Sequence, residues 1–315
     1  MTYDVVIVGA RCAGAALAVH LARTGLTVVA LEAAKLPSDQ PMSTHLIQPP
    51  GMDELDDLGI GARVRARTPA IHAGRFDFDD RTMTLRYGAG RAAHCLRRGE
   101  LDALLQNAAV AAGAALQPES RVVALAHARD GRVTGVDVQR ASGRTERLHA
   151  RLVVGADGRN STVARLVAAE EYLGYDAPRA CYWAYWQRPA DWDAGLLYNG
   201  SQHDHSRVLF PTDDDLVLIA SSPPVGRALG WRADHRAAYR ADVRACTPLA
   251  ALLGDAEPVG RVLGMVKARY FFRAATGPGW ALVGDAGHHK EFVTGLGITD
   301  ALRDARSLAS AIVAD

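Results

Sequence analysis

Apolar residues fall into short runs separated by amphipathic stretches, which predicts strands alternating with helices. The first run, residues 3–8, is rich in β-branched residues and lacks polar alternation, as in a strand buried on both faces of a parallel sheet. Apolar residues then recur at helical spacing over 15–22, Gly25 follows as a C-cap, and 27–31 returns as a second buried strand. These elements predict a βαβ unit.

The turn between the first strand and the helix has the chemistry of a nucleotide site. Gly9 permits a backbone angle that a Cβ would oppose, and Gly14 lets the helix approach the strand closely. The helix N-terminus offers free N–H groups to a diphosphate. Glu32, which ends the second strand, can accept hydrogen bonds from both ribose hydroxyls and would repel a 2′-phosphate, which favours FAD or NAD over NADP. Arg11 replaces the middle glycine of the pattern.

The rest of the chain changes from parallel to antiparallel patterning. Residues 33–50 are predicted to form a long loop that includes Ser43-Thr44-His45, and loops of this length are often functional. The next expected elements are a helix over 52–64, a hairpin over 76–87, a helix over 101–115, and strands at 122–125, 133–138 and 151–154. Aromatic antiparallel strands at 181–186, 208–210 and 216–220 follow, then one or two helices over 234–253, strands at 262–272 and 280–283, and a closing helix over 298–313.

Two further glycine turns follow buried strands and open helices. The first is Gly155-Ala-Asp157-Gly158, with Ser161 and Arg165 beyond it. The second begins at Gly284-Asp285 and continues through His288 to Gly295-Leu296-Gly297 and Asp300-Ala301.

Length and composition favour some classes of protein and exclude others. At 315 residues the chain exceeds what one core usually organises, so a large domain plus a smaller one is expected. A net charge of +1 argues against nucleic acid or an anionic membrane as a general partner. The four cysteines are scattered singly, which favours free thiols in a reducing compartment. Without a signal-type segment or a membrane-spanning run, a cytoplasmic location is expected.

Three glycine-bearing strand-to-helix turns in this order resemble the FAD-dependent monooxygenases and oxidoreductases of the p-hydroxybenzoate hydroxylase fold, and the likeness spans the chain. The resemblance implies an α/β protein with a Rossmann-like FAD-binding domain (1–70, 95–170 and 275–315) and a smaller antiparallel substrate domain with helices (71–94 and 171–274). It implies cofactor contacts at these positions: Gly9, Arg11, Cys12, Ala13, Gly14, Glu32, Ala33, Arg98, Val123, Asp157, Gly158, Gly284, Asp285, Gly295, Leu296 and Gly297.

The implied roles have physical explanations. Asp285 would accept a hydrogen bond from a ribityl hydroxyl, and Arg98 would lie near the ribityl chain or the diphosphate. The helix that begins near Gly295 would direct its N–H groups at the pyrimidine edge of the flavin. Two departures stand out: Phe292 occupies a position where proline is usual, and the chain ends soon after the last glycine motif, so part of the cofactor wall is expected to be absent.

The resemblance implies that NAD(P)H reduces FAD and that the reduced flavin adds O2 to give a C4a-hydroperoxide. This species would then hydroxylate a small aromatic or apolar substrate. A single dinucleotide turn fits transient NAD(P)H or a separate flavin reductase. The alternatives are a double-bond reductase of the geranylgeranyl-reductase type, a flavin-dependent halogenase, and a truncated noncatalytic flavin-binding protein. Lys290 invites the halogenase comparison, but the Trp-x-Trp-x-Ile-Pro signature of those enzymes is missing.

No residue stands out as a general acid or base, and none is required if the flavin carries the chemistry. The candidate pocket residues are His45, Trp183, Tyr185, Phe210 and Phe292. On one strand, either Trp183 and Tyr185 or Tyr182 and Trp186 can face the cofactor, because alternate residues point to opposite sides.

Histidine pairs in two places invite other interpretations. His203 and His205 lack a third ligand at metal-binding spacing, so a solvated strand or turn is expected there and no metal site is assigned. For His288 and His289 we expect contacts at the start of the last helix and not general-base chemistry.

Overall fold

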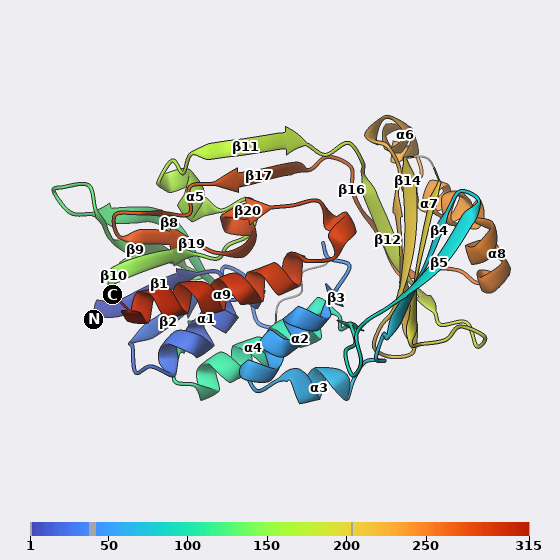
Figure 1. Cartoon of the computed structure of the whole chain (residues 1–315). Helices are drawn as coiled ribbons and strands as arrows, with labels where there is room; N and C mark the ends of the chain where they lie inside the picture. The colour runs from blue at the N-terminus through green and yellow to red at the C-terminus, as the bar shows by residue number, and fades with distance from the viewer. Residues whose placement is uncertain (1, 38–41, 203, 315) are drawn as a thin grey trace.

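The computed structural model describes residues 2–37, 42–202 and 204–314 (Figure 1). Two domains lie side by side: one built on a parallel sheet, here called the parallel-sheet domain, and one built on an antiparallel sheet, the antiparallel domain. The predicted fold class, α/β with a Rossmann-like domain and a smaller antiparallel domain, is confirmed.

The centre of the parallel-sheet domain is β1 (Thr2–Val8), which pairs in parallel with β2 (Val28–Leu31) and β10 (Thr145–Gly155). Strand order is β18-β19-β10-β1-β2-β7, with the hairpin β8-β9 joined through β10. The remaining strands are β7 (Ala115–Gln117), β8 (Ser120–His127), β9 (Val133–Arg140), β18 (Thr276–Gly277) and β19 (Trp280–Leu282). The carboxyl ends of β1, β2, β10 and β19 therefore meet at one edge, where the three glycine turns follow β1, β10 and β19.

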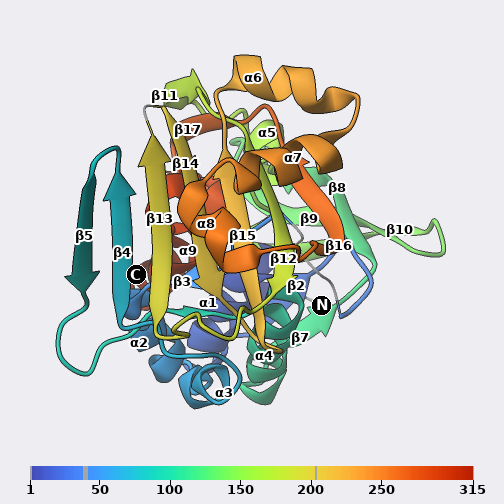
Figure 2. The same cartoon turned by 90° about the vertical axis from the view of Figure 1, so that its right-hand side faces the viewer.

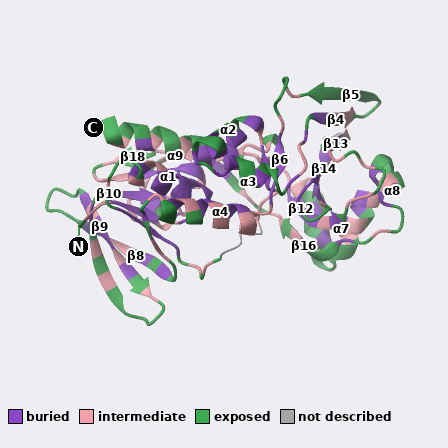
Figure 3. Ribbon diagram, turned by 90° about the horizontal axis from the view of Figure 1, so that it is seen from below, coloured by how far each residue is buried: buried purple, intermediate pink, exposed green. Residues whose placement is uncertain are grey.

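Helices cover both sides of this sheet. On one face α1 (Cys12–Ala22) packs against α4 (Arg98–Ala111) and α9 (Gly297–Ala314), and their apolar sides form a continuous core (Figure 3). On the other face the hairpin β8-β9 and the short α5 (Thr162–Leu166) bury a second apolar cluster. Every residue of β1 from Val5 to Val8 is buried, as the unbroken apolar run predicts.

The helix expected over 52–64 is divided in the structure. It forms two helices, α2 (Pro49–Asp57) and α3 (Gly61–Arg65), because the chain turns at Gly59 with a φ of +81°. Just before α2 lies β3 (Leu46–Ile47), which pairs with β6 (His94–Cys95).

The antiparallel domain is a seven-stranded sheet in the order β16-β12-β15-β14-β13-β4-β5 (Figure 2), antiparallel except between β13 and β4, which pair in parallel. Its strands are β4 (Ala73–Phe78), β5 (Arg81–Arg86), β12 (Cys181–Gln187), β13 (Leu196–Gln202), β14 (His205–Pro211), β15 (Leu216–Ser222) and β16 (Val259–Met265). The helices α6 (Val225–Leu229), α7 (His235–Arg244) and α8 (Thr247–Leu253) lie on the face turned away from the parallel-sheet domain.

The prediction of a single strand over 262–272 is wrong. The chain forms β16 in the seven-stranded sheet and then β17 (Arg269–Arg273), which pairs with β11 (Glu171–Asp176) and β20 (His288–His289) in a separate three-stranded sheet. Both halves are strand, so the apolar pattern continues across the point where the chain passes from one sheet to the other.

Residues of β12 alternate between the two faces of the antiparallel sheet, as predicted. Tyr182 and Trp186 pack with the outer helices. Trp183 faces the parallel-sheet domain, where it packs with Leu46 and Phe210, and Tyr185 packs against the same cluster.

Candidate cofactor site

One cavity of about 520 Å³ lies along the edge of the parallel sheet where the glycine turns meet. Its lining includes Gly9 and Glu32 from the first crossover, Asp157 from the central turn, and Asp285 and Gly295 from the last. The first and last glycine motifs, far apart in sequence, therefore face the same cavity. An extended dinucleotide needs such a space.

The end near the first crossover is shaped for a diphosphate. Gly9 has a φ of +100°, and a Cβ on Gly14 would lie 1.9 Å from the Gly9 carbonyl oxygen, so a larger residue at 14 would push the helix from the strand. Helix α1 begins at Cys12 without a side-chain cap and without an acidic residue in its first turn. Its N-terminal N–H groups are thus available to an anionic ligand beside Gly9, Arg11 and Ala13 in the cavity wall.

Glu32 lies at the end of β2, where it lines the cavity and is 5% exposed. One carboxylate oxygen accepts the backbone N–H of Ala10 at 3.3 Å and the other accepts that of Ala34 at 3.0 Å. The Nε atom of Arg11 lies 3.8 Å from the carboxylate. These contacts fix an acidic group where the sequence predicts ribose recognition. Arg11, which replaces the usual glycine, forms an ion pair with this group.

Arg98 begins α4 and lines the middle of the cavity. Its guanidinium donates to both carboxylate oxygens of Asp102, at 2.8 and 3.0 Å, and the Cys12 thiol donates to the same carboxylate at 3.4 Å. Asp102 is fully buried, so it holds Arg98 in one orientation toward the cavity.

Asp157 stabilises the central turn. One carboxylate oxygen accepts the Ser161 hydroxyl at 2.5 Å and the other accepts the backbone N–H of Thr162 at 2.7 Å, while Ser161 itself caps α5 by accepting from Ala164. The predicted motif residue thus orders its own loop, which places Gly158 and Arg159 in the cavity wall.

The last turn supplies the opposite end of the cavity. Burial raises the pKa of the Asp285 carboxyl, which His289 and Arg98 oppose with positive charge. Gly295 has a φ of +62° and precedes the N-terminus of α9, and a Cβ on Gly297 would meet only open space. The backbone at these two glycines carries no side chain, so a planar ring could approach the helix N-terminus there.

The structure brings most of the predicted site residues together. The cavity is lined by Gly9, Arg11, Cys12, Ala13, Glu32, Ala33, His45, Arg98, Asp157, Gly158, Asp285, Phe292, Gly295 and Gly297. Gly14, Gly284, Leu296 and Val123 do not line it; at the last position the neighbouring Val122 does, and Val123 is 41% exposed. The contact of each residue with a bound cofactor remains a prediction.

Several lining residues were not anticipated as cofactor contacts. Asp300 of α9 is 3% exposed and forms ion pairs with Lys290 at 2.6 Å and with Arg303 at 2.8 Å. In the sequence, Asp300-Ala301 stands at the end of the last glycine motif. This position is the feature that could have identified Asp300 as a lining residue. Arg159 follows the central glycine motif directly, whereas Met42 and Met265 come from a loop and a strand end that carry no local signature.

His45 connects the cavity to the antiparallel domain. It lines the cavity, is 2% exposed and has a φ of +62°. Its Nε2 atom lies 2.5 Å from the hydroxyl of Tyr185, and the two rings are stacked at 5.9 Å. Burial lowers the pKa of His45 to about 3, and the positive charge of Arg98 acts in the same direction, so the imidazole is neutral at physiological pH.

The other candidate pocket residues lie behind this contact. Phe292 lines the cavity, while Trp183, Tyr185 and Phe210 do not. Trp183 and Phe210 are buried in the apolar cluster that Phe292 and Tyr185 pack against. The arrangement gives this end of the cavity an apolar, aromatic boundary.

The two histidines of the last glycine motif form β20 (His288–His289), and the contact of His288 with the last helix lies beyond its first turn, at Asp304. His288 stacks on Phe272 and lies 3.5 Å from Asp304 in α9, and the Nδ1 atom of His289 contacts the carbonyl oxygen of Arg269 at 2.8 Å.

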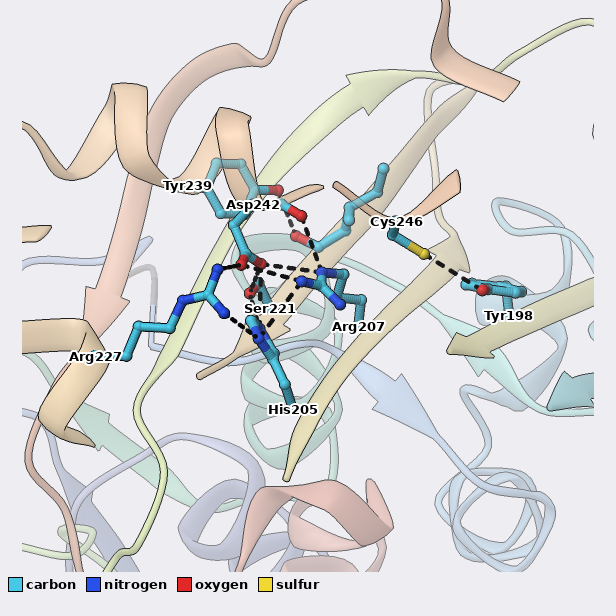
Figure 4. Close-up of polar contacts among 9 residues, drawn as sticks. Tyr198, His205, Arg207, Ser221, Arg227, Tyr239, Asp242 and Cys246 are labelled. Carbon is cyan, nitrogen blue, oxygen red and sulfur yellow. Dashed lines mark hydrogen bonds and ion pairs between the residues drawn. The ribbon is translucent and has the colours of Figure 1, made fainter. Parts of the chain in front are cut away.

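The expectation of a solvated His205 is wrong, and His203 lies outside the described residues. His205 is 5% exposed beneath α7, with its Nε2 atom 3.0 Å from the Ser221 hydroxyl and 3.1 Å from Asp242 (Figure 4). Arg207 and Arg227 also donate to Asp242. Burial alone would raise the pKa of Asp242, but the hydrogen bonds from His205, Ser221 and Arg207 outweigh it and lower the pKa to about 2.

Comparison with known families agrees with this geometry. Residues 2–315 match the family FAD_binding_3, described as FAD binding domain, so the chain belongs to this family of flavoproteins and FAD is its cofactor. The donor set fits that cofactor: a free helix N-terminus, a buried ribose-side carboxylate and a bare glycine wall line one cavity.

Two curated relatives are reductases. The chain is 32% identical over 166 residues to the menaquinone reductase of Mycolicibacterium smegmatis, covering 52% of this chain and 39% of that protein. It is 27% identical over 329 aligned positions to the digeranylgeranylglycerophospholipid reductase of Methanocella arvoryzae, covering 99% of this chain and 78% of that protein.

Solved structures share the fold. PqsL of Pseudomonas aeruginosa, in complex with 2-aminobenzoylacetate, superposes with a TM-score of 0.84 at 23% identity, covering 99% of this chain and 86% of that one. The myxobacterial chondrochloren halogenase CndH superposes with a TM-score of 0.87 at 20% identity, covering 100% of this chain and 76% of that one. The suspected p-hydroxybenzoate hydroxylase-type fold is confirmed. Among the described helices, none is long and apolar enough to span a membrane.

Proposed function

We propose that this protein is an FAD-dependent monooxygenase that uses NAD(P)H and O2 to hydroxylate a small aromatic or apolar substrate. The observation that carries the proposal is the boundary of the cofactor cavity at its last-crossover end. There, His45 and Phe292 meet the inner face of the antiparallel sheet through Tyr185. Such a boundary admits a planar or apolar molecule and excludes water.

Each part of the cavity has a distinct task in this proposal. Bound FAD would supply the redox chemistry, accepting electrons from NAD(P)H and passing them to O2. The N-terminus of α1 would hold the diphosphate, Glu32 the adenosine ribose and Asp285 a ribityl hydroxyl. The N-terminus of α9 would stabilise negative charge on the ring.

His45, held by the Tyr185 hydroxyl behind it, would orient the substrate and keep the site dry. A neutral imidazole joined to a phenol by a 2.5 Å hydrogen bond presents no net charge to an apolar substrate. The guanidinium of Arg97 lies 5.8 Å from the centre of the Tyr185 ring and pairs with Asp213 at 2.8 Å, which fixes the ring across the domain interface. Electrons would come from NAD(P)H binding transiently or from a separate flavin reductase.

Oxygen consumption tests the proposal directly. The purified protein, reconstituted with FAD, is incubated with NADH or NADPH and a panel of phenols, anilines and quinolones, while O2, hydrogen peroxide and products are measured. A monooxygenase consumes one O2 per hydroxylated product with little peroxide. Peroxide alone with every substrate, or failure to bind FAD, would contradict the proposal.

A double-bond reductase is the second candidate, because both curated relatives described above are reductases and one aligns along nearly the whole chain. Turnover of an unsaturated lipid or quinone under strict anaerobiosis would favour it. Halogenation has weaker support: the halogenase neighbours are about 20% identical or less, and Lys290 is held in an ion pair with buried Asp300.

A further inference from the structure

A second cavity of about 280 Å³ shares lining residues with the cofactor cavity and is lined by β11 and β17 of the three-stranded sheet. These two strands lie along the upper edge of Figure 1. Leu173 and Tyr175 of β11 are paired directly opposite Phe272 and Tyr270 of β17, so the four side chains share one face of that sheet. All four line the cavity, together with Val293 and Leu296 from the loop before α9.

The loop between β20 and α9 separates the two cavities. His289, Lys290, Glu291 and Thr294 line both. Phe292 faces only the cofactor cavity and Val293 only the second one. A molecule whose head lies beside Phe292 therefore has the second cavity immediately across this loop.

The second cavity suits an apolar ligand. Both charged residues of the shared loop are already paired, Lys290 with Asp300 at 2.6 Å and Glu291 with Arg179 at 2.6 Å. The hydroxyl of Tyr270 is buried and has no hydrogen-bond partner among the described residues. The lining is therefore mainly aromatic and aliphatic, with polar side-chain groups confined to the hydroxyls of Tyr175 and Tyr270 and to the shared residues His289, Lys290, Glu291 and Thr294.

Apolar side chains continue from the cavity onto the surface. Leu173 and Tyr175 are 53% and 51% exposed, and Val293 is 46% exposed. Large apolar side chains gathered at the mouth of a cavity mark a binding surface more often than scattered ones do.

We propose that the second cavity binds an apolar chain carried by the substrate, whose reacting head lies at the Phe292 end of the cofactor cavity. This inference rests on the proposed function and narrows the substrate to an amphipathic molecule: a planar head with a hydrocarbon chain. The two cavities share four lining residues of one loop, and this adjacency favours a chain carried by the substrate over a separate partner. Each methylene that leaves water on binding raises affinity about fourfold.

A homologous series of ligands tests the inference. Binding of 2-methyl-, 2-butyl- and 2-octyl-1,4-naphthoquinone to the FAD-loaded protein is followed through the flavin absorption spectrum. We expect affinity to rise about tenfold or more from the methyl to the octyl compound. Leu173→Arg and Val293→Arg should abolish this rise and leave the affinity of the methyl compound unchanged. Val313→Arg, at a 52% exposed position near the end of α9, is the matched control and should behave as the wild type.

A second measurement is independent of the head group. The fluorescent chain cis-parinaric acid should bind to the wild type and to Val313→Arg, and much more weakly to Leu173→Arg. The inference would be overturned if affinity rose equally with chain length in all the proteins. It would also be overturned if cis-parinaric acid did not bind and affinity did not rise with chain length.

Other occupants give different results. The arginine variants could instead leave the gain in affinity with chain length intact and alter NADH affinity, in which case the second cavity serves a nicotinamide cofactor. If they alter sedimentation with phosphatidylcholine vesicles, it serves a membrane surface. Either result contradicts the inference. Loss of hydroxylation with a normal gain in affinity with chain length would count against the proposed function alone.

Discussion

Replacing Glu32 with glutamine tests the recognition of the adenosine ribose. Both carboxylate oxygens accept backbone N–H groups, from Ala10 at 3.3 Å and Ala34 at 3.0 Å, and the residue is 5% exposed. In either orientation, the introduced side-chain amide would turn its NH2 group toward one of these donors. The substitution therefore removes the charge that would bind the ribose and disturbs the position of the side chain.

A hydrogen bond to a charged group contributes about 1.5–3 kcal/mol. Loss of one such bond to the ribose raises the Kd for FAD by about ten- to 150-fold. FMN lacks the adenosine ribose, so its affinity should change much less. We would measure both by titrating apoprotein with FAD or FMN and following flavin fluorescence.

Glu54→Gln is a matched control, because Glu54 is 6% exposed and pairs with Arg306 at 2.7 Å outside the cofactor cavity. It should leave both Kd values unchanged, with thermal unfolding reporting any general loss of stability. An FAD affinity of Glu32→Gln within twofold of the wild type, or an equal loss for FAD and FMN, would refute the assignment.

Three further predictions concern stability. The folded-state pKa of His45, about 3, lies below its unfolded value, so its contribution is complete above about pH 6.5 and is lost as pH falls toward 3. His45→Asn, which tolerates a positive φ, should therefore reduce the stability difference between pH 7 and pH 5, measured by urea unfolding, by about 2 kcal/mol; an unchanged difference would contradict a buried neutral imidazole. Asp242→Asn should lower the free energy of unfolding by about 3–5 kcal/mol at pH 7, and this loss should shrink as pH falls from about 4 to 2. Asp176→Asn, at a 90% exposed side chain, is the control and should have little effect. Equal effects of the two substitutions would show that the buried network is unimportant. Gly9→Ala places a Cβ 2.4 Å from a backbone carbonyl oxygen at a φ of +100° and should cost more than Gly25→Ala, where φ is +85° and nothing lies within 4 Å; matching unfolding temperatures would contradict the close approach.

The βαβ unit was predictable because every part of it has a local cause. An unbroken apolar strand, a helical repeat and glycines at 9, 14 and 25 each leave a mark in the sequence, and the positive φ angles of Gly9 and Gly25 agree with those marks. The cofactor end of the site follows from the same turns.

The errors arise where one pattern is compatible with two tertiary arrangements. Residues 262–272 are rich in apolar residues typical of a strand, yet the chain changes sheets between Met265 and Arg269. His205 lies at a strand start with polar neighbours, which resembles an exposed turn, and only its contact with Asp242 of α7 reveals that it is buried.

The contact between His45 and Tyr185 shows why the substrate end was less predictable than the cofactor end. The two residues are 140 positions apart, one on a loop and one on a strand of the other domain. The sequence singled out both, since a histidine in a long polar loop and an aromatic strand each suggest a pocket. Their hydrogen bond depends on how the two domains meet, through pairs such as Arg97 with Asp213. The turns that bind a cofactor are set locally, whereas the surface that selects a substrate is created by packing between domains, so the chemistry of this chain is easier to predict from its sequence than its specificity.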